Sequence, residues 1–137
     1  MRAVVGSDGG RVRVVIADDR PLVRSQLRRL LEAQPDFDVV GMGWSGMEAL
    51  RLVHELEPHV LVLDQDMDDV PGVQVAAHLG DAGMKIRVVL YAIDEGLGDD
   101  GMPRSSTTTQ VVLDDESLRA LMRAIRRPRA AQLARAN

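Results

Sequence analysis

Acidic residues stand at three points of the chain where metal or phosphoryl chemistry would need them. Asp18 and Asp19 follow the apolar run VRVVIA, Asp64 follows VLVL, and Asp114 follows QVVL. If these runs are parallel strands, their carboxyl ends meet at the sheet edge where such folds bind ligands. Carboxylates ~4–6 Å apart repel one another, and Mg²⁺, which prefers oxygen ligands, relieves that repulsion. The alternative is that these aspartates only cap the helices that follow.

Strands and helices alternate along the chain. Short β-branched runs, typical of strands buried on both faces, precede segments with apolar residues at helical spacing. The expected strands are 12–17, 37–42, 60–63, 86–91 and 110–113, and the expected helices are 21–34, 45–58, 73–82 and 115–127. Short connections between alternating elements predict an α/β fold, with a parallel sheet covered by helices on both faces.

One stretch, residues 94–109, interrupts this alternation. It holds four Gly or Pro residues and four acids in sixteen positions, with no helical period. Since a helix here would lose roughly 1 kcal/mol per Gly and ~3 per Pro, we expect a degenerate or disordered segment instead of a regular fourth helix. We further expect a flexible leader over 1–10, one domain over 11–127, and a tail or linker over 128–137.

Composition narrows the function classes. The 137 residues carry a net charge of −4, with 45% hydrophobic and 28% charged residues and no cysteine. A net negative chain is a poor nucleic-acid binder, and the lack of thiols excludes disulfides, zinc-thiolate sites and thiol catalysis. Apolar runs are too short to span a membrane. We therefore expect a soluble cytoplasmic domain without membrane contact.

The segment from Arg11 to Gly72 resembles a bacterial response-regulator receiver domain of the NarL/FixJ type. The resemblance rests on the motifs DDRPLVR and DFDVVG and on the acidic turn VLVLDQDMDDVPG, and it extends more weakly to Ile125. It implies a doubly wound five-stranded parallel sheet with the flavodoxin-like order 2-1-3-4-5. It also implies that one aspartate accepts a phosphoryl group from a histidine kinase, with Mg²⁺ bound beside it.

The resemblance assigns roles to particular residues of the first half. Asp64 occupies the phosphoacceptor position, and Asp18 and Asp19 match the acid pair that holds Mg²⁺. The backbone carbonyl of Asp66 matches the third protein ligand of the metal. Gly72 matches the glycine that ends the turn after the acceptor.

The second half departs from the family pattern. Counted without gaps, the switch Ser/Thr falls at Ala92, the switch aromatic at Val111 and the pocket lysine at Asp114. Lys85, the chain's one lysine, precedes the fourth strand, so we expect no other residue to supply that lysine. Tyr91 lies one residue before Ala92, and strand alternation predicts that it faces away from the pocket.

These departures indicate an atypical receiver. We expect an output independent of phosphorylation, weak Mg²⁺ binding, and control of transcription through an attached or partner DNA-binding domain, a helix-turn-helix that this chain does not contain. We expect neither enzymatic activity nor strong dependence on a histidine kinase. The alternatives are a conventional phosphorylatable receiver and a small-molecule sensor.

We also expect a homodimer, either through the first helix or through the last one. The last helix would expose an uncovered apolar flank, namely Leu118, Leu121, Met122 and Ile125.

Overall fold

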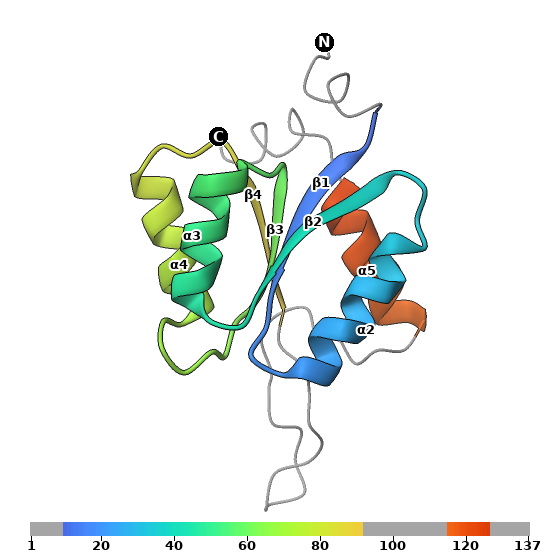
Figure 1. The fold of residues 1–137 in the computed structure, drawn as a ribbon, viewed down its shortest axis with the longest axis horizontal. Coiled ribbons are helices and arrows are strands. Elements are labelled where there is room, and N and C mark those ends of the chain that lie inside the picture. Colours follow the sequence, from blue (N-terminus) through green and yellow to red (C-terminus); the bar gives the residue numbers. More distant parts are fainter. Residues whose placement is uncertain (1–9, 92–114, 127–137) are drawn as a thin grey trace, which may run out of the picture.

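The computed structural model describes residues 10–91 and 115–126 and arranges them in three layers (Figure 1). Four parallel strands form one sheet in the order β2-β1-β3-β4. They are β1 (Val12–Ala17), β2 (Phe37–Gly43), β3 (Val60–Asp64) and β4 (Arg87–Tyr91). The helices are α2 (Pro21–Glu32), α3 (Gly46–Leu56), α4 (Gly72–Asp81) and α5 (Asp115–Arg126). The expected α/β fold with a parallel sheet of flavodoxin-like order is confirmed.

Several expectations concern residues outside the described ranges. The fifth strand at 110–113 and the irregular stretch at 94–109 both lie there. Residues 1–9 and 127–137, which make up nearly all of the expected leader and tail, lie there too. These expectations stay predictions.

The buried strands explain the two hydrophobic cores. Along β1, Val14 and Ile16 join the core under α2 and α5, whereas Val15 and Ala17 join the core under α3 and α4. The side chains of a strand alternate between the two faces of a sheet, so a continuous apolar run fills both cores at once. Figure 1 shows the helix pairs on either side of this sheet. Because the run VRVVIA forms the whole of β1, Asp18 follows it directly and lies at the carboxyl edge of the sheet.

The expected uncovered flank of the last helix is not found. Leu121, Met122 and Ile125 of α5 are buried in the core shared with α2 and the sheet. The Arg87 guanidinium donates to the backbone oxygens of Ala124 and Ile125 at 3.4 and 3.3 Å, which ties the end of α5 to β4. The helix thus covers its apolar face by packing within the chain, and the argument for a dimer from that face is wrong. The side chain of Leu118 lies outside the described residues.

Helix α3 is fixed at its start by two different caps. Ser45 accepts a hydrogen bond from the Glu48 backbone N–H at 3.0 Å, which is the usual role of a serine at an N-cap. The Asp69 carboxylate, from the turn after β3, accepts from the N–H groups of Gly46 and Met47 at 2.9 and 3.0 Å. A negative charge is favourable at this end of a helix. The turn after β3 is therefore fastened to α3.

Among residues 10–91 and 115–126, no helix combines the length and the apolar character needed to cross a bilayer.

Candidate functional site

Three aspartates converge at the carboxyl edge of the sheet. β1 and β3 are neighbours, with Ala17 paired to Leu63, so the residues that follow these positions lie side by side. Carboxylate oxygens of Asp18, Asp19 and Asp64 all lie within 4.8 Å of one another. Asp18 and Asp64 are 0% and 1% exposed, whereas Asp19 is exposed. The expected convergence is confirmed, and a set of carboxylate oxygens is the donor type that can hold a hard divalent cation.

A glycine allows the next helix to start close to this cluster. The Gly72 backbone N–H donates to the oxygen of Gln65 at 3.0 Å. A Cβ at Gly72 would lie 2.8 Å from the Asp64 oxygen and 2.9 Å from the Gln65 Cα, both backbone atoms that cannot yield. A side chain at this position would therefore push α4 away from the end of β3 and disturb the setting of Asp64.

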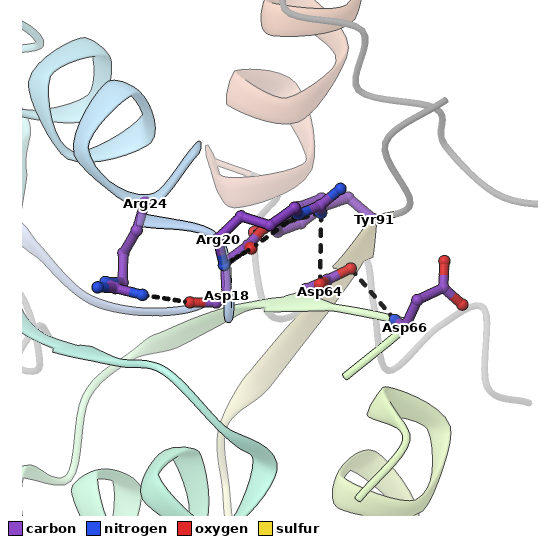
Figure 2. A network of polar contacts seen from close by, with 6 residues as sticks. All are labelled: Asp18, Arg20, Arg24, Asp64, Asp66 and Tyr91. Carbon is purple, nitrogen blue, oxygen red and sulfur yellow. Dashed lines mark hydrogen bonds and ion pairs between the residues drawn. The ribbon is translucent and has the colours of Figure 1, made fainter. Parts of the chain in front are cut away.

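An arginine that the sequence analysis missed lies among the acids. The Arg20 backbone N–H and Nε–H donate to Asp18 Oδ1 at 2.8 and 3.1 Å, and its Nη2 donates to Asp18 Oδ2 at 3.1 Å. The same Nη2 lies 3.3 Å from Asp64 Oδ2, so the guanidinium bridges the two buried acids (Figure 2). A cation therefore lies beside the expected acceptor, although it is an arginine that directly precedes α2 and not a lysine after the fifth strand. The available signal was that Arg20 directly follows the acid pair at the start of α2.

Tyr91 also reaches the cluster, against expectation. Its hydroxyl donates to Asp18 Oδ2 at 2.6 Å, and its ring is fully buried in the core under α2 and α5. Tyr91 pairs with Asp64 across the β3–β4 ladder, and residues paired across a ladder point to the same face. The prediction that Tyr91 faces away from the site is thus wrong, because the register places this residue beside Asp64. The expected switch position, Ala92, lies outside the described residues.

The main chain adds further contacts. The Arg24 guanidinium donates to the backbone oxygen of Asp18 at 2.7 Å, and the Asp66 backbone N–H donates to Asp64 Oδ1 at 3.1 Å (Figure 2). The Asp66 carboxylate is exposed and extends away from Asp64 in Figure 2, which leaves its main chain nearest the acceptor position. The role assigned to the Asp66 carbonyl stays a prediction. Val111 and Asp114 lie outside the described residues.

The charges of this cluster act on one another. The pKa of Asp64 is raised to about 6, chiefly by burial and also by the charges of Asp18 and Asp19, against the opposing effects of the Asp66 N–H and of Arg20. Partial burial and the Asp18 charge likewise raise the pKa of Asp19. Burial and Asp18 raise the pKa of the Tyr91 hydroxyl well above its ordinary value, so it remains a proton donor. Near pH 7 Asp64 is therefore mainly a carboxylate.

Comparison with known proteins fits this geometry. Residues 14–99, more than half of the chain, match the family model described as the response regulator receiver domain. The transcriptional regulatory protein BtsR of Salmonella typhi is 39% identical over 84 residues, which cover 61% of this chain and 35% of that protein. The transcriptional regulatory protein LiaR of Bacillus subtilis is 39% identical over 88 residues, covering 61% of this chain and 41% of that protein. The matched region thus spans about two fifths or less of these relatives.

Solved structures show the same fold. The signal receiver domain of the putative response regulator NarL from Mycobacterium tuberculosis superposes with a TM-score of 0.64 and 28% identity, over 86% of this chain and 98% of that one. A two-component response regulator of the LuxR family from Aurantimonas superposes with a TM-score of 0.58 and 29% identity, over 63% and 61% of the two chains. With the family model matched over most of the described core, the chain belongs to the response-regulator receiver domain family.

Proposed function

We propose that this chain is a signalling module that regulates transcription through an attached or partner DNA-binding domain, and that its output does not require phosphorylation of Asp64. The family membership supports the first half, as do the relatives BtsR and LiaR, which are transcriptional regulatory proteins by name. The proposed role is regulatory and includes no catalysed reaction. We assign DNA contact to that attached or partner domain, a helix-turn-helix.

The placement of Tyr91 is the observation that carries the second half. In the family that the chain resembles, a small side chain with a hydroxyl stands at the end of the fourth strand. That hydroxyl moves when it binds an oxygen of the phosphoryl group. Here β4 ends, beside Asp64, in a tyrosine whose ring is buried and whose hydroxyl is committed to Asp18. A ligand shifts a conformational equilibrium only through contacts that differ between the two states. A hydroxyl already engaged in the core offers a phosphoryl group little differential contact.

The acidic cluster itself supports weak Mg²⁺ binding. Asp18, Asp19 and Asp64 supply oxygen donors within 4.8 Å of one another, and we assign the backbone carbonyl of Asp66 as a further ligand. A bound Mg²⁺ supplies positive charge beside Asp64. The affinity is weak because the Arg20 guanidinium already balances part of the negative charge of Asp18 and Asp64.

The runner-up is a conventional receiver, in which Asp64 accepts a phosphoryl group from a histidine kinase. The ionised, partly neutralised carboxylate of Asp64 favours it. We separate the two by incubating the chain with a small-molecule phosphodonor and Mg²⁺, then measuring intact mass and association by light scattering, in wild type and Asp64→Ala. We expect the association state to be the same in every arm. A change of state that needs both the donor and Asp64 would establish the runner-up.

The third candidate is a small-molecule sensor that uses the same strand-end pocket. A thermal-shift screen with a metabolite panel tests it, because a ligand that binds the folded state raises the melting temperature. A hit whose shift is lost in Asp64→Asn would favour the sensor over the constitutive module.

We further propose a homodimer that forms through the first helix, because the last helix covers its apolar face within the chain. The apolar face of α5 is covered, but Leu22, Trp44 and Met47, at the carboxyl edge of the sheet, are 82%, 59% and 60% exposed. Leu22 is the most exposed of these side chains, and large apolar surface left in water favours association. Leu22 lies at the start of the first helix, α2, so we assign the dimer surface to that part of the helix. Light scattering should give a dimer mass for wild type and a monomer mass for Leu22→Glu.

A further inference from the structure

Arg20 has the geometry of a competitor for the metal site, not that of a passive neighbour. We propose that Arg20 is a tethered cation, which occupies the acidic cluster in the resting protein and must leave it before a divalent cation can bind. The inference deepens the proposed function, because it rests on the cluster of Asp18, Asp19 and Asp64 being a metal site.

The first argument is that Asp18 has its acceptor oxygens engaged without a metal. Oδ1 accepts from the Arg20 backbone N–H and from Nε, at 2.8 and 3.1 Å. Oδ2 accepts from Arg20 Nη2 and from the Tyr91 hydroxyl, at 3.1 and 2.6 Å. A metal ligand must offer a lone pair at about 2.0–2.1 Å from Mg²⁺. A metal bound to Asp18 therefore has to displace donors that are already in place, and the guanidinium supplies two of the four.

The second argument is the bridge to Asp64. Arg20 Nη2 lies 3.1 Å from Asp18 Oδ2 and 3.3 Å from Asp64 Oδ2, between the two buried acids that a metal would join (Figure 2). A guanidinium stays charged at every accessible pH. Mg²⁺ at the same place would therefore meet a fixed positive charge within a few ångströms, in a poorly solvated pocket where repulsion is strong. The two cations exclude one another.

The third argument is that Arg20 has a way out. Its side chain is 28% exposed, whereas the two acids are 0% and 1% exposed. It stands at the N-cap position of α2, where its side chain makes no capping hydrogen bond, so the helix does not need the guanidinium to begin. The long stem of an arginine can carry its charged head to water while the backbone stays in place. The guanidinium can therefore leave Asp18 and Asp64 by a rotation of the side chain, without loss of a helix cap.

The chain supplies a matched control on the same helix. Arg28 has the same charge, but its Nε pairs with Glu32 on the open surface at 3.1 Å, where the two side chains are 51% and 45% exposed. Replacing either arginine by glutamine changes the net charge by the same amount. Only Arg20→Gln removes the cation from the acidic cluster.

The test is a titration of the full chain with Mg²⁺ and with Mn²⁺, by calorimetry and by melting temperature, in wild type, Arg20→Gln, Arg28→Gln and Asp64→Asn. We expect Arg20→Gln to bind at least about tenfold more tightly than wild type, since two charge-assisted contacts no longer compete. Arg28→Gln should bind as wild type does, and Asp64→Asn should bind more weakly.

The outcomes separate the two proposals. Equal affinity in wild type and Arg20→Gln, with binding lost in Asp64→Asn, would overturn the tethered-cation inference and leave the metal site standing. No binding in any variant would remove the metal site and the inference together. A measurement on wild type guards against a misfolded variant: saturating Mg²⁺ should shift the Arg20 Nε–H resonance in ¹⁵N spectra to that of a solvent-exposed guanidinium. An unmoved resonance at saturation contradicts the inference.

Discussion

Arg20 and Arg126 both pair with aspartate, but they do so in opposite surroundings. Arg126 grips Asp36 through Nε and Nη2 at 2.7 and 2.9 Å, and both side chains are about 40% exposed. Arg20 contacts Asp18 and Asp64 at 3.1–3.3 Å, yet both acids are buried. The shorter contacts are expected to contribute less, because water competes for exposed ions and leaves buried acids without an alternative partner. Distance alone does not rank these pairs.

The surroundings of the two arginines also differ in what they can release. Arg126 lies 4.7 Å from the Phe37 ring centre and donates to Gln34 as well, so it joins α5 to the turn before β2. When Arg126 releases Asp36 and Gln34, water can solvate both side chains. Arg20 holds two acids that a metal can also hold. The pair of Arg126 and Asp36 holds two parts of the fold together. At Asp18 and Asp64, by contrast, we propose that Arg20 and a divalent cation compete for the same carboxylates.

The strongest way to sharpen this comparison is to remove the buried cation. Arg20→Gln should lower the free energy of unfolding by about 2–3 kcal/mol at pH 7 in EDTA, because Asp18 and Asp64 lose their counter-ion. Urea titration with a fluorescence readout measures the change. Millimolar Mg²⁺ should restore part of the loss in the variant and change wild type much less. If the variant is as stable as wild type in EDTA, the buried contacts of Arg20 contribute no more to stability than the exposed pair of Arg126 and Asp36.

The next effect concerns the second donor to Asp18. Tyr91→Phe removes the hydroxyl at 2.6 Å but keeps the buried ring, and it should destabilise the protein by about 2 kcal/mol, the range for a hydrogen bond to a charged group. Urea midpoints of wild type and variant give the value. If Tyr91→Phe leaves the free energy of unfolding unchanged, the hydrogen bonds from Arg20 alone are enough for the Asp18 carboxylate.

The pH dependence of Asp64 is smaller and has a definite sign. Its pKa is raised to about 6 from an ordinary 3.8, so the folded state binds this proton more tightly than the unfolded state does. The stability that the bound proton provides is present below about pH 4 and is lost as the pH rises through 6. Asp64→Asn cannot ionise and should therefore stabilise the protein by about 1 kcal/mol at pH 8, after discounting for screening, and by almost nothing at pH 4. Thermal melts at both pH values decide it, and equal gains at both would contradict the shift.

The smallest effect is expected at the exposed pair. Arg126→Gln should lower the free energy of unfolding by about 0.5 kcal/mol, and the loss should shrink further in molar salt. The Arg126 hydrogen bond lowers the pKa of Asp36, so this contribution is present at neutral pH and disappears as the pH falls through the lowered pKa. Denaturation at low and high salt tests it. A loss as large as that of Arg20→Gln would break the comparison.

The sequence predicted the elements better than it predicted their side-chain contacts. β1 was expected over 12–17 and is found there, because an uninterrupted β-branched run has one natural reading. The convergence of Asp18 and Asp64 followed from the same logic, since parallel neighbours end at one edge. Periodicity tells which residues face a core, and short acidic side chains at strand ends have little freedom to lie elsewhere.

Arg20 and Tyr91 show where this logic stops. The sequence pattern gave Arg20 no role, but its long side chain folds back onto Asp18 and reaches Asp64, a placement set by charge and not by spacing. Tyr91 was assigned to the wrong face because alternation was counted from Ala92, and an error of one residue inverts every orientation in a strand. The burial of α5 was missed for a third reason. Whether an amphipathic helix is covered depends on neighbours that its own sequence does not name.

The clasp between Asp69 and the start of α3 bears on how freely this loop can be exchanged. Asp69 binds the backbone of Gly46 and Met47, and a Cβ at Gly46 would lie 2.7 Å from both the Cβ and the backbone oxygen of Val70. Two segments more than twenty positions apart in the sequence are thus complementary in shape and in hydrogen bonding. A protein engineer who grafts the turn after Asp64 from another receiver must transplant the opening of α3 with it, and homologous recombination between the two segments would separate a matched pair.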